Sequence, residues 1–320
     1  MKAAIVRDAG HTPVFGDFPE PPLSAGQNRV TVTAAAMSHL AKSRALGTHY
    51  SSSARFPFIA GIDGVGRLDD GKRVYFVLPQ PPYGSMAERV VASSAHCIAL
   101  PDDIDDLTAA AIANPGMSSW AALTERAKLK AGETVLINGA TGTSGRLAVQ
   151  IAEHLGAKKV IATGRNADAL RAVSALGADV TISLVAGDLE ERLEEQFAAG
   201  VDVVIDYLWG QSAESLLIAG AKAGADAVPI RFVQIGASSG PNIVLPSAAL
   251  RSSAIELMGS GIGSIPLDRL LKAAAGVLEA TVPRAFQVAF TPVPLSEVEH
   301  AWRNDDSMRR TVFTMGVHPS

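Results

Sequence analysis

The chain has 320 residues, enough for two domains of ordinary size or for one large domain. Apolar residues make up 48% and charged residues 19%, and the formal net charge of −4 does not suggest the basic surface that nucleic-acid binding requires. The single cysteine, Cys97, excludes an internal disulfide and a zinc site built on several cysteines, and it fits a reducing compartment.

The start of the chain lacks the features of a secretory signal. A short apolar run after Met1 is interrupted by Arg7 and Asp8, so it is too short for the apolar region of a signal peptide. The sequence also contains no run of about 18 apolar residues that would cross a bilayer. We therefore expect a cytoplasmic protein that has neither a membrane nor a nucleic acid as its partner.

The residues before Pro101 form short strand-like runs that glycine and proline separate. The predicted strands are Ala3–Val6, Arg29–Ala34, Gly64–Leu68, Arg73–Val77 and Arg89–Val91. Closely spaced short strands with turn signals between them predict a β-rich module.

After Pro101 a helical segment, Leu107–Ala113, is followed by strands and helices in alternation. The predicted strands are Thr134–Ile137, Val160–Thr163, Val201–Ile205, Phe232–Ile235 and Ile255–Met258. The predicted helices are Leu147–Leu155, Ala167–Leu176, Leu189–Ala199 and Ser212–Ala221. This alternation predicts an α/β fold with a doubly wound parallel sheet, and the apolar strands indicate that helices cover both faces.

The C-terminal stretch is too short to fold alone. It contains a predicted helix over Leu267–Glu279, a strand over Ala285–Phe290, a helix over Ser296–Arg303 and a strand over Thr311–Thr314. It either extends the second domain or returns to complete the β-rich module.

A glycine-rich turn follows the strand Thr134–Ile137. The first amides of a helix have no intrahelical partner and favour an anion, and Gly142 would let a pyrophosphate approach them while Gly145 lets the helix pack on the strand. Because a strand precedes this A-x-G-x-x-G turn and a second strand follows the helix, we favour a dinucleotide site over a plain tight turn. The candidate residues are Ala140, Thr141, Gly142, Thr143, Ser144 and Gly145.

The second strand of this unit ends without an acidic residue. NAD-binding sites usually carry an Asp or Glu there, whereas this strand runs into Gly164, Arg165 and Asn166. A guanidinium suits the 2′-phosphate of NADPH, so we predict NADPH as the cofactor. The alternative is that Arg165 is an ordinary solvated loop residue.

Several segments along the chain match one known family. They are Met1-Lys2-Ala3-Ala4, Pro21-Pro22 with Gly26, Ala60-Gly61-Ile62-Asp63-Gly64-Val65-Gly66, Tyr83-Gly84-Ser85-Met86-Ala87-Glu88, Gly116-Met117-Ser118-Ser119-Trp120 and Leu129-Lys130-Ala131-Gly132-Glu133. On these motifs the chain resembles the medium-chain dehydrogenase/reductase superfamily, and within it the zinc-independent quinone oxidoreductase branch, over nearly its full length.

The resemblance implies an architecture and an oligomeric state. A GroES-like catalytic domain would comprise residues 1–114, a Rossmann dinucleotide-binding domain residues 115–255, and residues 256–320 would return to complete the catalytic domain. Many members of the family are homodimers, so we expect a homodimer. The resemblance also implies that further residues contact the cofactor, namely Ser118, Leu208, Ile235, Gly236, Ala237, Gly259 and Ser260.

The resemblance also allows the zinc-ligand positions of the family to be compared with this chain. Zinc-dependent members carry a Cys-His pair early in the β module and a G-H-E segment later, and this chain has Ser38 at the cysteine position and Ile62 at the histidine position. We therefore expect no metal. Hydride transfer would then need an acceptor that is already electrophilic, such as a quinone or an α,β-unsaturated carbonyl.

The candidate catalytic residues are Ser38, His39 and Tyr50. His39 either donates a proton or a hydrogen bond to the substrate or bonds a backbone carbonyl, and Tyr50 either covers the substrate or fills a loop. Ser38 and Ala41 replace the Asn and Asp usual in the quinone branch, whereas Asp63 is expected to be structural.

The resulting hypothesis is an NADPH-dependent reductase of quinones or α,β-unsaturated carbonyls. Two alternatives stay open. One is a zinc-free alcohol or aldehyde dehydrogenase that uses Ser38 and His39, and the other is a non-catalytic NADPH-binding redox regulator, since a fold alone does not prove chemistry.

Overall fold

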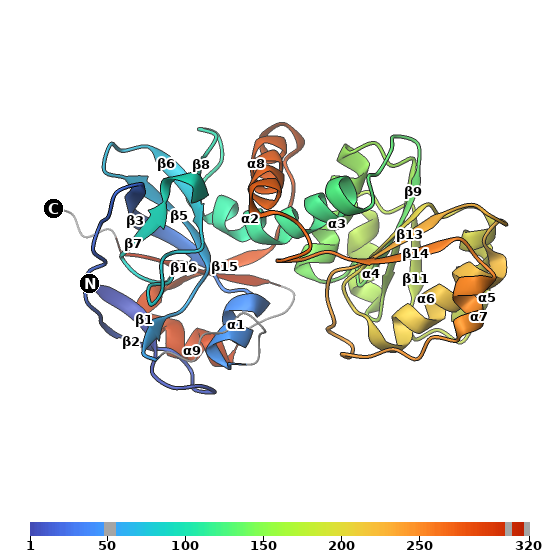
Figure 1. Ribbon diagram of the computed structural model, residues 1–320, viewed down its shortest axis with the longest axis horizontal. Helices are drawn as coiled ribbons and strands as arrows, with labels where there is room; N and C mark the ends of the chain where they lie inside the picture. The colour runs from blue at the N-terminus through green and yellow to red at the C-terminus, as the bar shows by residue number, and fades with distance from the viewer. Residues whose placement is uncertain (48–55, 305–308, 317–320) are drawn as a thin grey trace. The chain divides into compact units, whose positions relative to one another are not determined.

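The computed structural model describes residues 1–47, 56–304 and 309–316, and it contains two compact units (Figure 1). The first unit consists of Met1–Asn114 and Leu278–Ser320, and the second of Pro115–Val277. The domain assignment expected from the resemblance, with a boundary after residue 255, stays a prediction, and residues 256–277 lie in the second of these compact units. The strand that begins at Ile255 pairs with the parallel sheet of that unit.

The second unit is built on a six-stranded parallel sheet. Its strands are β9 (Thr134–Asn138), β10 (Lys159–Gly164), β11 (Val180–Ser183), β12 (Val203–Asp206), β13 (Ile230–Gln234) and β14 (Ile255–Gly259). Their spatial order is β11-β10-β9-β12-β13-β14, which confirms the predicted doubly wound sheet. The order reverses between β9 and β12, and in such sheets a ligand binds beyond the carboxyl ends of the strands at this point.

Helices cover both faces of the parallel sheet. They are α3 (Thr143–His154), α4 (Ala167–Ser174), α5 (Leu189–Ala198), α6 (Gly210–Ala223) and the short α7 (Ser247–Arg251). Figure 1 shows α3 and α4 on one side of the sheet and α5 and α6 on the other. The side chains of Leu136, Val204, Phe232, Phe197 and Leu216 form the core between the sheet and the second pair of helices.

The first unit contains two sheets that are mostly antiparallel. The smaller sheet has the order β2-β1-β4, with strands at Val14–Asp17, Lys2–Val6 and Phe58–Ile59. The larger sheet follows the order β15-β16-β3-β5-β6-β8, with strands at Phe290–Pro294, Arg310–Thr314, Gln27–Ala36, Asp63–Leu68, Arg73–Val77 and Cys97–Ala99, and β7 (Arg89–Ser93) pairs with β3. The helices α1 (His39–Ala45) and α9 (Val298–Arg303) also belong to this unit.

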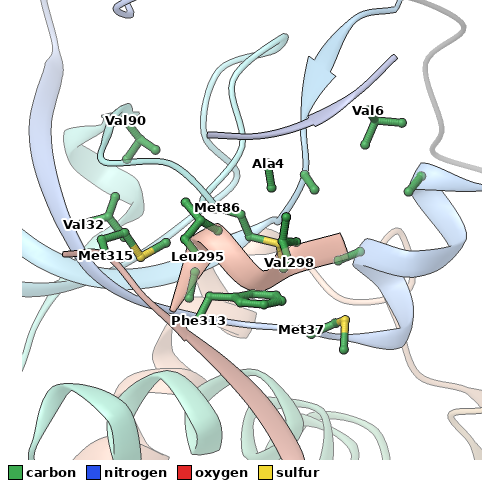
Figure 2. Close-up of a cluster of buried hydrophobic side chains, with 14 of the residues drawn as sticks. Ala4, Val6, Val32, Met37, Met86, Val90, Leu295, Val298, Phe313 and Met315 are labelled. Atoms are coloured by element: carbon green, nitrogen blue, oxygen red, sulfur yellow. The ribbon is translucent and has the colours of Figure 1, made fainter. Parts of the chain in front are cut away.

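The core of the first unit joins residues from both ends of the chain. Figure 2 shows Met86 from the N-terminal region beside Leu295, Val298 and Phe313 from the C-terminal region, all of them buried. In addition, β16 pairs antiparallel with β3. The C-terminal stretch therefore returns to the β-rich module, which was one of the two possibilities that the sequence left open.

Two helices continue through prolines that lie beyond their predicted ends. Helix α2 (Asp106–Ala121) continues through Pro115, and α8 (Leu267–Arg284) continues through Pro283. The predicted strand Ala285–Phe290 is wrong, because the strand begins only at Phe290. It contains two prolines, which are tolerated since β15 lies at the edge of its sheet. None of the described helices combines the length and apolar character needed to span a bilayer.

Candidate functional site

The glycine-rich turn lies between β9 and α3, at the point where the strand order reverses. Gly142 is the N-cap of α3, and it has no side chain with which to cap the helix. The amides of Thr143, Ser144 and Gly145 precede the first intrahelical hydrogen bond, which the Arg146 amide donates to the Gly142 carbonyl at 2.9 Å. The turn therefore presents several unpaired donors together with the positive end of the helix dipole.

The two glycines of the turn meet different surroundings. A Cβ atom on Gly145 would lie 2.3 Å from the carbonyl oxygen of Gly139 and 2.6 Å from the Cα of Ala140, so glycine is required there for the helix to pack against the strand end. A Cβ atom on Gly142 would meet no neighbour closer than 4.0 Å. Gly142 therefore leaves an open space above the helix amides, and a pyrophosphate fits such a space.

A buried polar network lies beneath the turn and joins the ends of three strands. Thr163 on β10 donates its hydroxyl to Asn138 Oδ1 on β9 at 2.7 Å and accepts the Gly139 amide at 3.3 Å. Asn138 Nδ2 donates to Asp206 Oδ1 on β12 at 2.8 Å. The three side chains of this network are fully buried, so it fixes the relative positions of the strand ends on both sides of the reversal point.

The carboxylate of Asp206 also holds the loop that follows β12. Asp206 accepts hydrogen bonds from the amides of Leu208 at 2.9 Å and Trp209 at 3.1 Å. Burial raises the pKa of the Asp206 carboxyl, and these hydrogen bonds oppose the rise. Trp209 has φ of 56° and ψ of −157°, a conformation that side chains other than glycine rarely adopt, so the carboxylate holds a strained turn in place.

The end of β10 presents an unpaired positive charge. Gly164 packs against Thr141, because a Cβ atom on Gly164 would lie 2.4 Å from the Thr141 methyl group. Arg165 follows as an exposed residue, and within the described chain its guanidinium has no hydrogen-bond or ion-pair partner. Asn166 caps α4 by accepting the Ala169 amide at 2.9 Å.

The other expected cofactor residues of the second unit also lie at the carboxyl edge of the sheet. Leu208 follows β12, while Ile235, Gly236 and Ala237 follow β13, and Gly259 and Ser260 lie at the end of β14. The Ile235 amide donates to the Asp206 carbonyl at 2.7 Å, and the Ser260 amide donates to the Gln234 carbonyl at 2.8 Å. The structure thus gathers the expected residues along one edge.

Ser118 has a different environment from its neighbour Ser119. Its hydroxyl donates to the Pro115 carbonyl at 2.8 Å within α2. Ser119, which was not among the residues expected from the sequence, is fully buried and lies 2.7 Å from the Tyr207 hydroxyl and 3.2 Å from the Ser144 carbonyl. Burial raises the pKa of the Tyr207 hydroxyl. Ser119 therefore connects α2 to the glycine-rich turn and to the end of β12.

The candidate catalytic residues lie in the first unit. Ser38 caps α1, since its hydroxyl oxygen accepts the Ala41 amide at 3.0 Å, a structural role that was not expected from the sequence. His39 is the first residue of α1 and is exposed, and the structure shows no bond to a backbone carbonyl among the residues it describes. Tyr50 lies outside the described residues.

A buried carboxyl group lies near the start of β5. Asp63 is 1% exposed, accepts the Tyr75 hydroxyl at 2.9 Å and accepts Asn114 Nδ2 at 3.3 Å. Burial raises the pKa of Asp63 to about 6, opposed by the charge of Arg310 and by these two hydrogen bonds. Asp63 thus joins two strands and a helix of the first unit, in agreement with the expected structural role.

The positions at which zinc-dependent members carry ligands hold other side chains here. Ile62 is buried and apolar, and Ser38 uses its oxygen to cap a helix. Among the described residues no group of three or more His, Cys, Asp and Glu side chains is arranged to hold a metal ion.

Comparisons with known proteins agree with this geometry. A family model described as zinc-binding dehydrogenase matches residues 145–279. The protein named "Probable NADPH-dependent quinone reductase tdiC" from Emericella nidulans is 28% identical, and the alignment covers 96% of this chain and 98% of that protein. The quinone oxidoreductase of Thermus thermophilus, whose crystal structures include a complex with NADPH, is 27% identical, with a TM-score of 0.81 over 98% of this chain and 100% of that one.

The chain belongs to the medium-chain dehydrogenase/reductase superfamily. Within this superfamily it falls in the quinone oxidoreductase-like branch, as its motifs predicted, and it is accordingly an oxidoreductase of a nicotinamide-dependent family. A mycobacterial quinone oxidoreductase at 22% identity shares the fold, with a TM-score of 0.84. The family model matches only residues from 145 to 279, so its name does not bear on Ser38 or Ile62.

Proposed function

We propose that this protein is an NADPH-dependent reductase of quinones or α,β-unsaturated carbonyls that works without zinc. The observation that carries the proposal is the exposed Arg165 at the end of β10, which has no partner among the described residues and follows a strand that neighbours the glycine-rich turn. A carboxylate at this position would repel a 2′-phosphate, whereas a guanidinium binds it. The names of the relatives from Emericella nidulans and Thermus thermophilus, an NADPH-dependent quinone reductase and a quinone oxidoreductase crystallised with NADPH, support the same cofactor and substrate class.

Each part of the cofactor has a candidate partner in the second unit. The amides of Thr143, Ser144 and Gly145 would hold the pyrophosphate, and Arg165 would hold the 2′-phosphate. The nicotinamide half would lie toward the ends of β12, β13 and β14, where the remaining expected residues are Leu208, Ile235, Gly236, Ala237, Gly259, Ser260 and, from α2, Ser118. NADPH supplies a hydride when bound, and the chain supplies orientation and polar groups.

The absence of zinc in this proposal rests on residue types. An isoleucine at position 62 cannot bind a metal, and the hydroxyl of Ser38 is a poor replacement for a thiolate. Without Lewis-acid assistance the substrate must already be electrophilic, which quinones and enones are. His39 is the candidate that would donate a proton or hydrogen bond to the substrate oxygen, because it is exposed and an imidazole ring carries N–H donors.

The absorbance of the reduced nicotinamide tests this proposal directly. The protein is mixed with NADPH or NADH and with a panel of quinones, enones and aldehydes, and its zinc content is measured separately. We expect oxidation of NADPH with quinones or enones. Turnover of simple aldehydes only would favour the dehydrogenase that uses Ser38 and His39, and tight NADPH binding without any turnover would favour the redox regulator. Stoichiometric zinc in the purified protein would contradict the zinc-free mechanism.

A further inference from the structure

We infer that Arg146 is a second ligand for the 2′-phosphate, so that selection of NADPH over NADH depends on two arginines and not on Arg165 alone. This inference rests on the proposed function, since it concerns the same cofactor site.

The side chain of Arg146 folds back over the glycine-rich turn. Arg146 lies in the first turn of α3, and its Nε donates to the carbonyl oxygen of Thr141 at 3.0 Å. This bond uses one of the five N–H donors of the guanidinium. Within the described chain the two terminal nitrogens have no other partner, so the planar fork of Arg146 is held in place while its remaining donors are free.

Arg146 and Arg165 adjoin the same pair of residues. Arg146 is bonded to Thr141, the side chain of Thr141 packs against Gly164, and Arg165 follows Gly164 in the chain. The two arginines therefore flank the contact between the first and second strand-to-helix turns. In such sheets the adenosine ribose of the cofactor lies at this contact, and its 2′ position carries a phosphate in NADPH and a hydroxyl in NADH.

The charges around this contact favour an anion. Neither Arg146 nor Arg165 forms an ion pair with any residue that the structure describes. Asp168, the acid that follows Arg165 most closely in the sequence, is paired with Arg171. In a chain with a net charge of −4, two uncompensated guanidiniums on either side of the Thr141–Gly164 contact would suit a phosphate dianion, and planar forks can bind its oxygens in pairs.

The experiment measures dissociation constants by titration calorimetry for NADPH, NADH, 2′,5′-ADP and 5′-AMP. The proteins are the wild type, Arg146→Gln, Arg146→Lys and Arg165→Gln. We expect Arg146→Gln to weaken NADPH and 2′,5′-ADP about tenfold or more, and NADH and 5′-AMP less than about twofold. Arg146→Lys should give an intermediate loss, because it keeps the charge and loses the planar fork.

The control variant is Lys222→Gln, which removes one positive charge from the last turn of α6. That turn lies at the opposite edge of the sheet, since α6 begins at the carboxyl edge and runs back, and the change should leave all dissociation constants as in the wild type. Thermal unfolding of each variant checks that it is folded.

Two results would overturn the role of Arg146. One is an unchanged preference for NADPH in Arg146→Gln, and the other is an equal loss of all four ligands, which would indicate that Arg146 only supports the turn. A wild type that binds NADH as tightly as NADPH, or binds neither, would instead contradict the proposed function itself.

Discussion

Gly142 and Gly145 stand three residues apart in one turn, and the structure separates their roles. The space beside Gly142 is open, while Gly145 touches the backbone of Gly139 and Ala140. Gly142 is therefore not needed for packing. Its lack of a side chain instead leaves the helix amides accessible to a ligand. The second glycine is needed for the protein to fold with its helix against the strand end.

Substitution at these two glycines should separate binding from stability. We predict that Gly142→Val weakens NADPH binding about tenfold or more, because its side chain fills the pyrophosphate space, and changes the free energy of unfolding by less than about 1 kcal/mol. Gly145→Ala should instead cost about 1–3 kcal/mol of stability, since backbone atoms must move. Calorimetric titration and urea unfolding measure the two effects. Equal loss of stability in both variants would contradict this assignment.

Asp63 should make the stability of the protein depend on pH. Its native pKa of about 6 exceeds the ordinary value of 3.8, so between these values the native state binds a proton that the unfolded state does not. The free energy of unfolding therefore falls as pH rises through this interval, by up to about 3 kcal/mol from this group.

The variant Asp63→Asn removes the titrating group at this position. We predict that between about pH 4 and pH 7 the wild type loses up to about 3 kcal/mol more stability than this variant, because only the wild type must ionise a buried carboxyl group. Urea unfolding at several pH values measures the difference between the two proteins. Parallel pH profiles would show that Asp63 does not titrate in this range.

At the scale of the elements, the carboxyl ends of β9, β10 and β12 are joined by side chains as well as by the backbone ladder. We predict that Thr163→Val costs about 1–3 kcal/mol, because it leaves the Gly139 amide and Asn138 Oδ1 without their partner in a buried place. The same substitution at Thr181, on the neighbouring β11, should change stability by less than about 0.5 kcal/mol, since no described residue bonds that hydroxyl. Urea unfolding of both variants compares them, and equal changes would contradict a network at this position.

The glycine-rich turn and the doubly wound sheet could be predicted from the sequence because both depend on local patterns. Strand–helix alternation and the spacing of Gly142 and Gly145 lie within short windows of the chain. The network of Asn138, Thr163 and Asp206 could not be derived in this way, since it depends on which strands become neighbours, and Asn138 and Asp206 are 68 positions apart. A signal was present nonetheless, because each of these polar residues stands at or near the end of an apolar strand.

Errors in the prediction of other elements have similar physical causes. The strand begins only at Phe290 and contains prolines at 292 and 294, and the local pattern does not show that this segment lies at a sheet edge, where prolines are tolerated. The sequence also does not reveal that β14, which begins at Ile255, joins the parallel sheet. Ser38 could not be recognised as a helix cap while α1 itself was not predicted.

At the scale of the whole molecule, the edge strand β14 is the place where we expect two copies to pair. Among the residues that the structure describes, β14 is bonded on one side only, to β13, and Leu257 on it is 40% exposed. An uncovered edge strand with an apolar side chain is a template for a second strand.

We predict a homodimer of about 66 kDa, twice the 33.2 kDa of one chain, by analytical ultracentrifugation. Leu257→Lys should shift the equilibrium toward the monomer, whereas Val185→Lys, at an exposed apolar residue beyond the opposite edge strand β11, should not. A wild type that sediments as a monomer at all concentrations would contradict the predicted dimer. A dimer that Leu257→Lys leaves intact while Val185→Lys dissociates it would show that the contact lies elsewhere.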